Sequence, residues 1–168
     1  MPEKMKWPVV PNVGLRGHDG FGDGSFNAPR VAGSHSAGKA PGTQYGHMGL
    51  DLATMADRSV IIPPFGGRIS LPGFAYKGGA GDLRSIHIIG SGDWKRYRAT
   101  ILYARLYPGF VDGTEVKDGE HIALAQDIAG FKMVGTTRIM KNHIHLELRR
   151  WNGTTVELLD PTEYLETT

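Results

Sequence analysis

The sequence predicts a mainly β protein built on a twisted antiparallel sheet with few short helices. Three observations lead to this fold class. The 168 residues include 24 glycines and 10 prolines, and a chain so rich in both turns often and forms few long helices. From residue 59 onward, short runs of β-branched and aromatic residues recur between turn residues. Finally, residues 142–149 alternate polar and apolar side chains, which is the period of a half-buried strand.

The expected elements follow from these signals in chain order. Residues 1–46 are rich in glycine, lack periodicity and are expected to form loops, apart from one short strand or edge at 26–31. The basic and aromatic run 94–98 favours a solvated strand or hairpin edge over a binding patch. A turn of helix is expected at 160–165, capped by Asp160 with Pro161 at its first position. Further strands are expected at 60–62, 68–71, 85–89, 99–106 and 121–125, with turns at 63–67 and 116–120.

Composition limits the class of protein. A chain of 168 residues is expected to form one domain with a proper core. No apolar run approaches the length of a membrane span, and a net charge of +2 gives no reason to expect a nucleic-acid partner. Residues 1–7 lack the apolar stretch of a signal peptide. We therefore expect synthesis in the cytoplasm, followed by retention there or export as a virion component or by another route.

Two short runs, distant in the chain, carry the residues suited to chemistry. Residues 47–51 read HMGLD, and residues 142–147 read NHIHLE. The chain has no cysteine, so any metal must use histidine, aspartate or glutamate. Imidazole nitrogens and carboxylate oxygens suit a four-coordinate zinc ion, and three protein ligands would leave one position for water.

The strand period places His143 and His145 on one face, roughly 7 Å apart at Cα. One imidazole can then bind a metal while the other reaches the water or substrate beside it. His47 and Asp51 would lie about 13 Å apart in a straight strand, so the chain must bend between them, and Gly49 allows this at low cost. The competing interpretation of His-x-His is an ordinary exposed polar face.

These residues, in this order, resemble the lysostaphin-type zinc metallopeptidases, the LytM-like peptidoglycan endopeptidases. The run 47–51 is similar to the family's His-x-Gly-x-Asp motif, and 142–149 to its His-Leu-His-Phe-Glu signature. Four further segments resemble its opening segment, its strand–turn–strand, its Val-x-x-Gly-x-x-Ile and its common ending: residues 24–30, 60–69, 116–122 and 160–165.

The resemblance implies a duplicated-hybrid-motif fold with a narrow groove. It implies a LytM-like domain at residues 24–168, preceded by an N-terminal extension or loop region at 1–23. His47, Asp51 and His145 would bind one zinc ion. His143 would lie beside the metal as a base or transition-state stabiliser. The implied substrate is a peptide bond in the stem or cross-bridge of bacterial peptidoglycan.

One departure from the family pattern concerns the second catalytic imidazole. Residues 102–106 read LYARL, where the family has Tyr-Ala-His-Leu. Arg105 stays protonated and cannot act as a base, but it can donate hydrogen bonds to a developing oxyanion. His87 and His121, on neighbouring strands, are expected to be structural or exposed rather than to replace the missing imidazole.

Two alternatives to a peptidoglycan peptidase remain open at this stage. The first is a catalytically degenerate zinc-binding module with a structural or binding role in a virion or other assembly, for example a phage tail or baseplate. Relatives of the family that bind zinc without cleaving anything also lack the second imidazole. The second is an autonomous cytoplasmic peptidase acting on another substrate.

Overall fold

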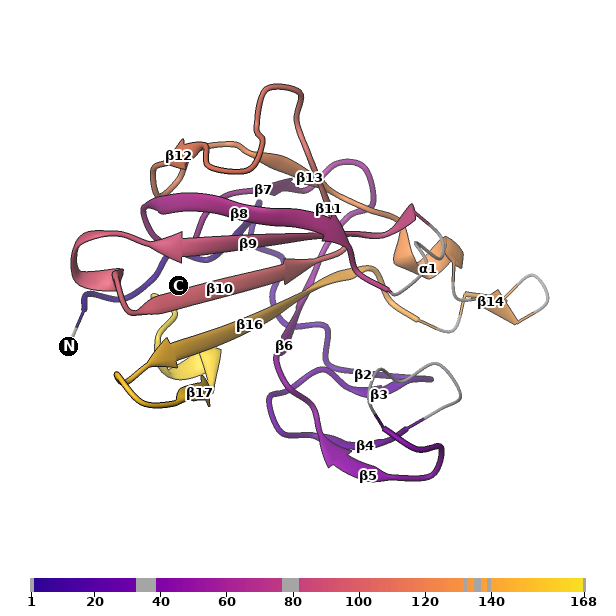
Figure 1. Ribbon diagram of the computed structural model, residues 1–168. Coiled ribbons are helices and arrows are strands. Elements are labelled where there is room, and N and C mark those ends of the chain that lie inside the picture. Colours follow the sequence, from indigo (N-terminus) through magenta and orange to yellow (C-terminus); the bar gives the residue numbers. More distant parts are fainter. Residues whose placement is uncertain are drawn as a thin grey trace.

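A seven-stranded antiparallel sheet forms the body of the protein (Figure 1). The computed structural model describes residues 2–32, 39–76, 82–131, 133–134, 137–138 and 140–167. The strand order is β12-β8-β9-β10-β16-β17, and β6 also pairs with β16. The strands of this large sheet are β6 (Leu50–Ala53), β8 (Gly67–Phe74), β9 (Arg84–Gly90), β10 (Tyr97–Leu102), β12 (Glu115–Val116), β16 (His143–Trp151) and β17 (Val156–Leu159).

Among the described residues, a smaller sheet and three hairpins make up the rest of the β structure. The small sheet has the order β1-β7-β13-β11, with β1 (Val9–Val10), β7 (Val60–Ile61), β11 (Ala104–Leu106) and β13 (Ala123–Ala125). The hairpins pair β2 (His18–Asp19) with β3 (Gly22–Asp23), β4 (Pro29–Val31) with β5 (Gln44–Gly46), and β14 (Met133–Val134) with β15 (Thr137–Arg138). The prediction of a mainly antiparallel β fold is confirmed.

Helices are short, as expected. In the part of the chain that the structure describes, they are α1 (Ile128–Phe131) and the 3-10 helices η2 (Gly92–Trp94) and η3 (Pro161–Glu163). The predicted cap is confirmed, because the backbone N–H of Thr162 donates to Asp160 Oδ1 at 2.9 Å. Within the described residues, we find no helix with the length and apolarity that a membrane crossing needs.

The core lies between the two sheets and explains the alternation in β16. Ile144, Leu146 and Leu148 point into it and are fully buried, as the period predicts. The opposite face of β16 is also buried from residue 143 to residue 147, so the prediction of a half-buried strand is wrong there. There Asp51 of β6 and His47, which precedes β6, lie 2.9 and 3.0 Å from His145. Other core residues come from both sheets: Ile61, Ile69, Ile86, Ile88, Ile101, Ile122 and Ala123.

The run 99–106 does not form the single strand that its apolar residues predict. It is divided at Tyr103, whose φ of 69° lies in the left-handed region. Residues before Tyr103 belong to β10 in the large sheet, and residues after it belong to β11 in the small sheet. The chain therefore crosses from one sheet to the other within one residue.

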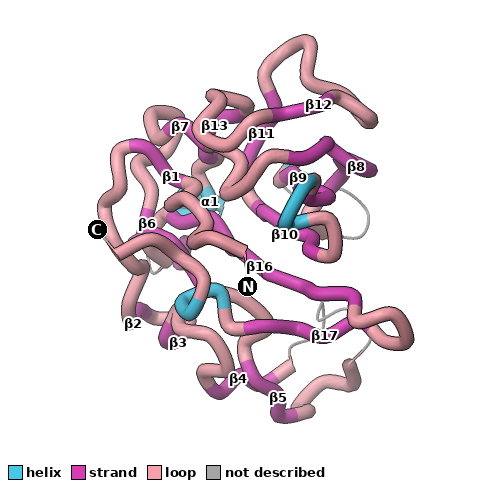
Figure 2. The backbone as a smooth tube through the Cα atoms, turned by 90° about the vertical axis from the view of Figure 1, so that its left-hand side faces the viewer, coloured by secondary structure: helices cyan, strands magenta, loops and turns pink. Residues whose placement is uncertain are grey.

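The N-terminal part of the chain contains more structure than its glycine-rich sequence predicts. The hairpins β2–β3 and β4–β5 lie below β6 in both views (Figures 1 and 2). Residues 14–16 run antiparallel beside β6, with a bridge between Leu15 and Leu52. This segment therefore lies next to the strand that carries Asp51.

Candidate metal centre

Strand pairing brings the two polar runs together. Strands β6 and β16 are antiparallel neighbours, and their register places Asp51 directly opposite His145. Directly opposite residues point to the same face of a sheet, with Cβ atoms about 5 Å apart. The carboxylate and the imidazole, which are distant in sequence, therefore meet on one face of the large sheet.

His47 reaches the same place through the predicted bend. It follows β5, and its backbone exchanges two hydrogen bonds of 2.8 Å with Asn27 and Ala28. The chain then bends at Gly49 before β6 begins. Gly49 lies against the ring of His145, since a Cβ at this position would be 2.7 Å from its Cε1 and Nε2 atoms. The φ of Gly49 lies outside the left-handed region, so this position needs glycine for close approach rather than for backbone freedom.

Three ligand atoms converge in this group. His47 Nε2 lies 3.0 Å from His145 Nδ1 and 3.3 Å from Asp51 Oδ1, and His145 Nδ1 lies 2.9 Å from the same oxygen. All three side chains are at least nine-tenths buried. The family resemblance implies these three residues as metal ligands, and the structure brings them together.

Each histidine ring is oriented by a hydrogen bond at the nitrogen that points away from Asp51. His47 Nδ1–H donates to the Ser25 carbonyl at 2.9 Å, and His143 Nδ1–H donates to the Lys141 carbonyl at 2.8 Å. His145 Nε2–H faces Glu147 Oε1 at 3.4 Å. Carbonyl and carboxylate oxygens only accept, so in a neutral ring the other nitrogen of each histidine turns its lone pair toward Asp51. Such far-side partners are typical of metal-binding histidines.

The charges in the group favour a cation. Two lone-pair nitrogens and a carboxylate oxygen cannot share so small a space unless a proton or a metal ion lies among them. Without a metal, burial opposes the charged form of His145, but hydrogen bonds to Asp51 and Glu147 outweigh it and raise its pKa to about 9. Burial also disfavours charge on Asp51, yet its side-chain contacts with His145 and His47 hold its pKa well below the usual range. This donor set fits zinc.

His143 lies beside the three ligand atoms without joining them. Its Nε2 is 3.7 Å from Asp51 Oδ2. Burial lowers the pKa of His143, so its ring is neutral at pH 7. Its other neighbour is Tyr103, which meets the imidazole edge to face with ring centroids 5.4 Å apart. The Tyr103 hydroxyl lies 2.8 Å from that of Tyr76.

Sequence reasoning missed Arg16 and Asp19. The Arg16 side chain is almost fully buried, and its Nε forms an ion pair with Asp51 Oδ2 at 3.0 Å. Its Nη1 donates to Asp19 Oδ2 at 2.7 Å and its Nη2 donates to the Gly22 carbonyl at 3.0 Å. Asp19 Oδ2 also accepts from the backbone N–H of Lys141 at 2.9 Å. No local pattern in the glycine-rich segment pointed to this contact.

The remaining predicted residues lie outside the group. Arg105 is exposed and forms an ion pair with Asp82. His87 is half-buried and shares a hydrogen bond of 2.9 Å with Thr100 Oγ1, whereas His121 is exposed. The expectation that these two histidines are structural or exposed agrees with this placement. The predicted catalytic roles of His143 and Arg105 stay predictions.

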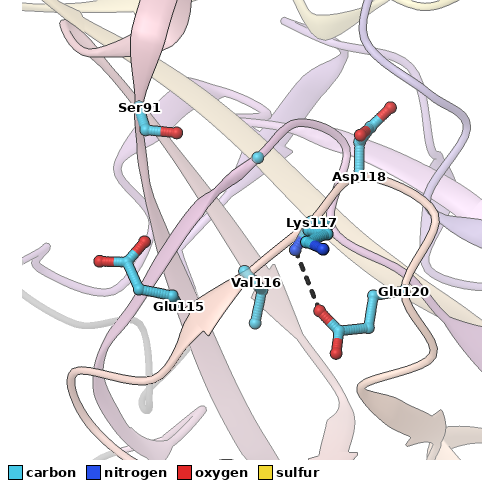
Figure 3. Close-up of a pocket in the computed structure, with 7 residues that line it drawn as sticks. Ser91, Glu115, Val116, Lys117, Asp118 and Glu120 are labelled. Atoms are coloured by element: carbon cyan, nitrogen blue, oxygen red, sulfur yellow. Dashed lines mark hydrogen bonds between the residues drawn. The ribbon is translucent and has the colours of Figure 1, made fainter.

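A shallow pocket next to β12 lies apart from the group and has a different character (Figure 3). Two of its three carboxylates have partners: Glu120 accepts a hydrogen bond from the backbone N–H of Lys117 at 3.0 Å, and Asp118 lies 3.6 Å from the ammonium of Lys6. We assign this pocket no role.

Solved structures share this fold at low sequence identity. The chain superposes on Helicobacter pylori Csd3 with a TM-score of 0.63 and 18% identity, over 99% of this chain and 36% of that one. The catalytic domain of the antimicrobial peptidase lysostaphin from Staphylococcus simulans gives 0.51 and 20%, over 80% and 88% of the two chains. The fold is that of the lysostaphin-type peptidases. A LytM protein from Ruminococcus gnavus gives 0.56 and 18%, over 95% and 58%.

The predicted resemblance to lysostaphin-type peptidases is thus confirmed at the level of the fold. The chain spans only about a third of the length of Csd3. In sequence, no protein-family model and no curated protein matches it. The likeness supports an architecture, and any activity must be argued from the chain's own residues.

Proposed function

We propose that the protein is a zinc-dependent metalloendopeptidase that cleaves peptide bonds in bacterial peptidoglycan. One observation carries this proposal: His47, Asp51 and His145 turn three ligand atoms toward one another, and the neutral imidazole of His143 lies next to them. A metal group with a base beside it is the arrangement that hydrolysis of an amide requires. The shared fold with lysostaphin suggests the substrate class.

The three ligand residues would hold the zinc ion, which when bound supplies a Lewis acid for activating water and polarising a carbonyl. His143 would accept a proton at Nε2 and later give it to the leaving amine. The Lys141 carbonyl fixes the His143 ring for this task, because it holds the hydrogen on Nδ1. Arg105 would donate hydrogen bonds to the developing oxyanion, after exchanging its exposed partner Asp82 for substrate.

Release of muropeptides from purified sacculi tests the proposal. The zinc-loaded wild type is compared with His143→Ala and with a matched control, His121→Ala, which removes an exposed histidine outside the group. We expect release by the wild type and the control, and a loss of about a hundredfold or more in His143→Ala. Equal release from all three proteins, or none from any, would contradict the proposal.

A second candidate is a zinc-binding module without catalysis. It is favoured by Arg105, which stands where the family has an imidazole and which here forms an ion pair with Asp82 at the surface. Zinc would then act by stabilising the native state alone. Chelation would lower the melting temperature of such a module, and sacculi would release nothing at any zinc concentration.

The biological setting is part of the proposal. Both candidates would act at the cell wall, and both are compatible with assembly into a larger particle such as a phage tail or baseplate. Co-purification of the protein with tail proteins from a phage lysate would support that setting. Recovery of the protein only as a free chain would argue against it.

A further inference from the structure

We propose that Arg16 is a positioning residue of the metal centre, which holds the carboxylate of Asp51 so that a single oxygen, Oδ1, faces the metal. This inference rests on the proposed zinc site, and it adds a residue from the glycine-rich N-terminal segment. It makes residues 14–19 part of the site rather than an extension beside it.

The two oxygens of Asp51 have separate partners. Oδ1 faces His47 at 3.3 Å and His145 at 2.9 Å, whereas Oδ2 faces Arg16 Nε at 3.0 Å and, at a longer distance, His143 Nε2 at 3.7 Å. A carboxylate with both oxygens free could turn and bind a metal through both. The guanidinium occupies one oxygen and leaves the other for the cation, which preserves an open position on the metal.

Arg16 is itself held rigidly. Its backbone N–H donates to the Asp51 carbonyl at 2.9 Å, which fixes residue 16 beside β6. Asp19 and the Gly22 carbonyl accept from the two terminal nitrogens at 2.7 and 3.0 Å. The guanidinium thus donates two hydrogen bonds through its terminal nitrogens, while Nε lies 3.0 Å from Asp51 Oδ2 as an ion pair without hydrogen-bond geometry. A lysine ammonium on a flexible stem cannot be fixed in this planar arrangement.

The same hydrogen-bond network also reaches His143. Asp19 Oδ2 accepts from the backbone N–H of Lys141, and the carbonyl of Lys141 accepts from His143 Nδ1. Arg16 and Asp19 therefore support both the metal-binding carboxylate and the backbone that orients His143. Partners of this kind typically change metal affinity by about tenfold to a hundredfold when removed.

A competing role for Arg16 predicts that its removal changes the zinc affinity in the opposite direction. If Arg16 only neutralised a buried carboxylate, its positive charge would repel a divalent cation, and its removal would tighten metal binding. If Arg16 positions Asp51, its removal weakens binding despite the lost repulsion. The direction of the change in zinc affinity therefore separates the two roles.

The experiment measures the zinc dissociation constant of each protein by competition with a chromophoric chelator at fixed pH. The variants are Arg16→Gln, Arg16→Lys and Asp19→Asn. Arg58→Gln is the matched control, because it removes the same charge from an exposed residue between β6 and β7. We expect about tenfold to a hundredfold weaker binding for Arg16→Gln, a smaller loss for Arg16→Lys and Asp19→Asn, and none for the control.

Cobalt supplies a second readout that a purely structural role would not change. Co²⁺ absorbs strongly in the visible range when four-coordinate and weakly when its coordination number rises. If Asp51 turns to bind through both oxygens in Arg16→Gln, the absorbance per bound cobalt falls relative to the wild type. If Arg16→Gln does not fold, as judged by loss of a cooperative melt, Arg16→Lys and Asp19→Asn carry both measurements.

The outcomes separate this inference from the proposed function. Zinc binding that is unchanged or tighter in Arg16→Gln overturns the role of Arg16 and leaves the peptidase proposal intact. Arg16-dependent zinc binding without muropeptide release supports Arg16 and overturns the peptidase. A wild type that binds no zinc overturns both.

Discussion

Gly49 leaves no room for a side chain between its own backbone and the ring of His145. A Cβ at residue 49 would lie 2.7 Å from two ring atoms of His145 and would also press on the carbonyl of Leu146. Contacts this short would displace either residue 49 or the atoms that it meets. His145 and Leu146 both belong to β16. The position therefore links the bend of the chain to the placement of a metal-binding imidazole.

Gly49→Ala should displace His145 and weaken the metal centre. We expect zinc affinity to fall by about tenfold or more, and the protein to lose about 1–3 kcal/mol of stability through overpacking. Chelator competition and thermal melting measure the two effects. Gly66→Ala is the matched control, since a Cβ there would meet only ordinary contacts at 3.7 Å and beyond. A Gly49→Ala protein that binds zinc like this control would refute the steric account.

Removal of zinc should lower the thermal stability of the wild type. Zinc at about a thousand times its dissociation constant stabilises the native state by roughly 4 kcal/mol, or about 10 °C for a domain of this size. His145→Ala should melt at the same temperature with and without zinc, whereas His121→Ala should behave like the wild type. A melting temperature of the wild type that ignores both zinc and chelator would rule out a native metal site.

The metal-free protein should lose stability as the pH rises through about 9. The pKa of His145 is raised from 6.5 to about 9 in the folded state, so its proton contributes stability that is fully present below pH 6.5 and is lost above the folded pKa. We expect a fall of about 3 °C or more in the melting temperature between these limits. Zinc should take the place of this proton, so the loaded protein should show no such fall. A flat profile for the metal-free protein would contradict the charged His145.

Arg105→Ala should separate catalysis from metal binding. Its ion pair with Asp82 is exposed, so the variant should change stability by less than about 1 kcal/mol and leave zinc affinity unaltered. Muropeptide release should drop by about a hundredfold if Arg105 donates to the oxyanion. Asp82→Asn removes the same ion pair but keeps the guanidinium, and it should release muropeptides normally. Full activity in Arg105→Ala would remove Arg105 from the mechanism.

Residue patterns in the sequence predicted much of the large sheet and the three candidate metal ligands. The alternation of polar and apolar residues in 142–149 predicts a strand from its period alone. Ile144 and Leu146 of this strand are buried in the core, as expected. The bend before Asp51 follows from one glycine. The pairing of Asp51 with His145 is a register between distant strands, and metal-ligand chemistry and the family resemblance pointed to it where strand periodicity could not.

Two features could not be predicted because no local signal carries them. The contact of Arg16 with Asp51 depends on residues 14–16 pairing with β6, and a glycine-rich segment has no periodicity to indicate a strand. The division of the run 99–106 depends on a left-handed tyrosine, a conformation that bulky residues rarely adopt. An unbroken apolar run therefore looked like one strand.

The crossing at Tyr103 also fixes how the two sheets can move. Strand β10 is paired on both edges in the large sheet, and β11, which follows after one residue, is paired with β13 in the small sheet. Only Tyr103 lies between these two paired strands, so the chain has a single residue there with which to change the angle between the sheets. A substrate that separated the sheets at this point would have to break backbone hydrogen bonds of β10 or β11.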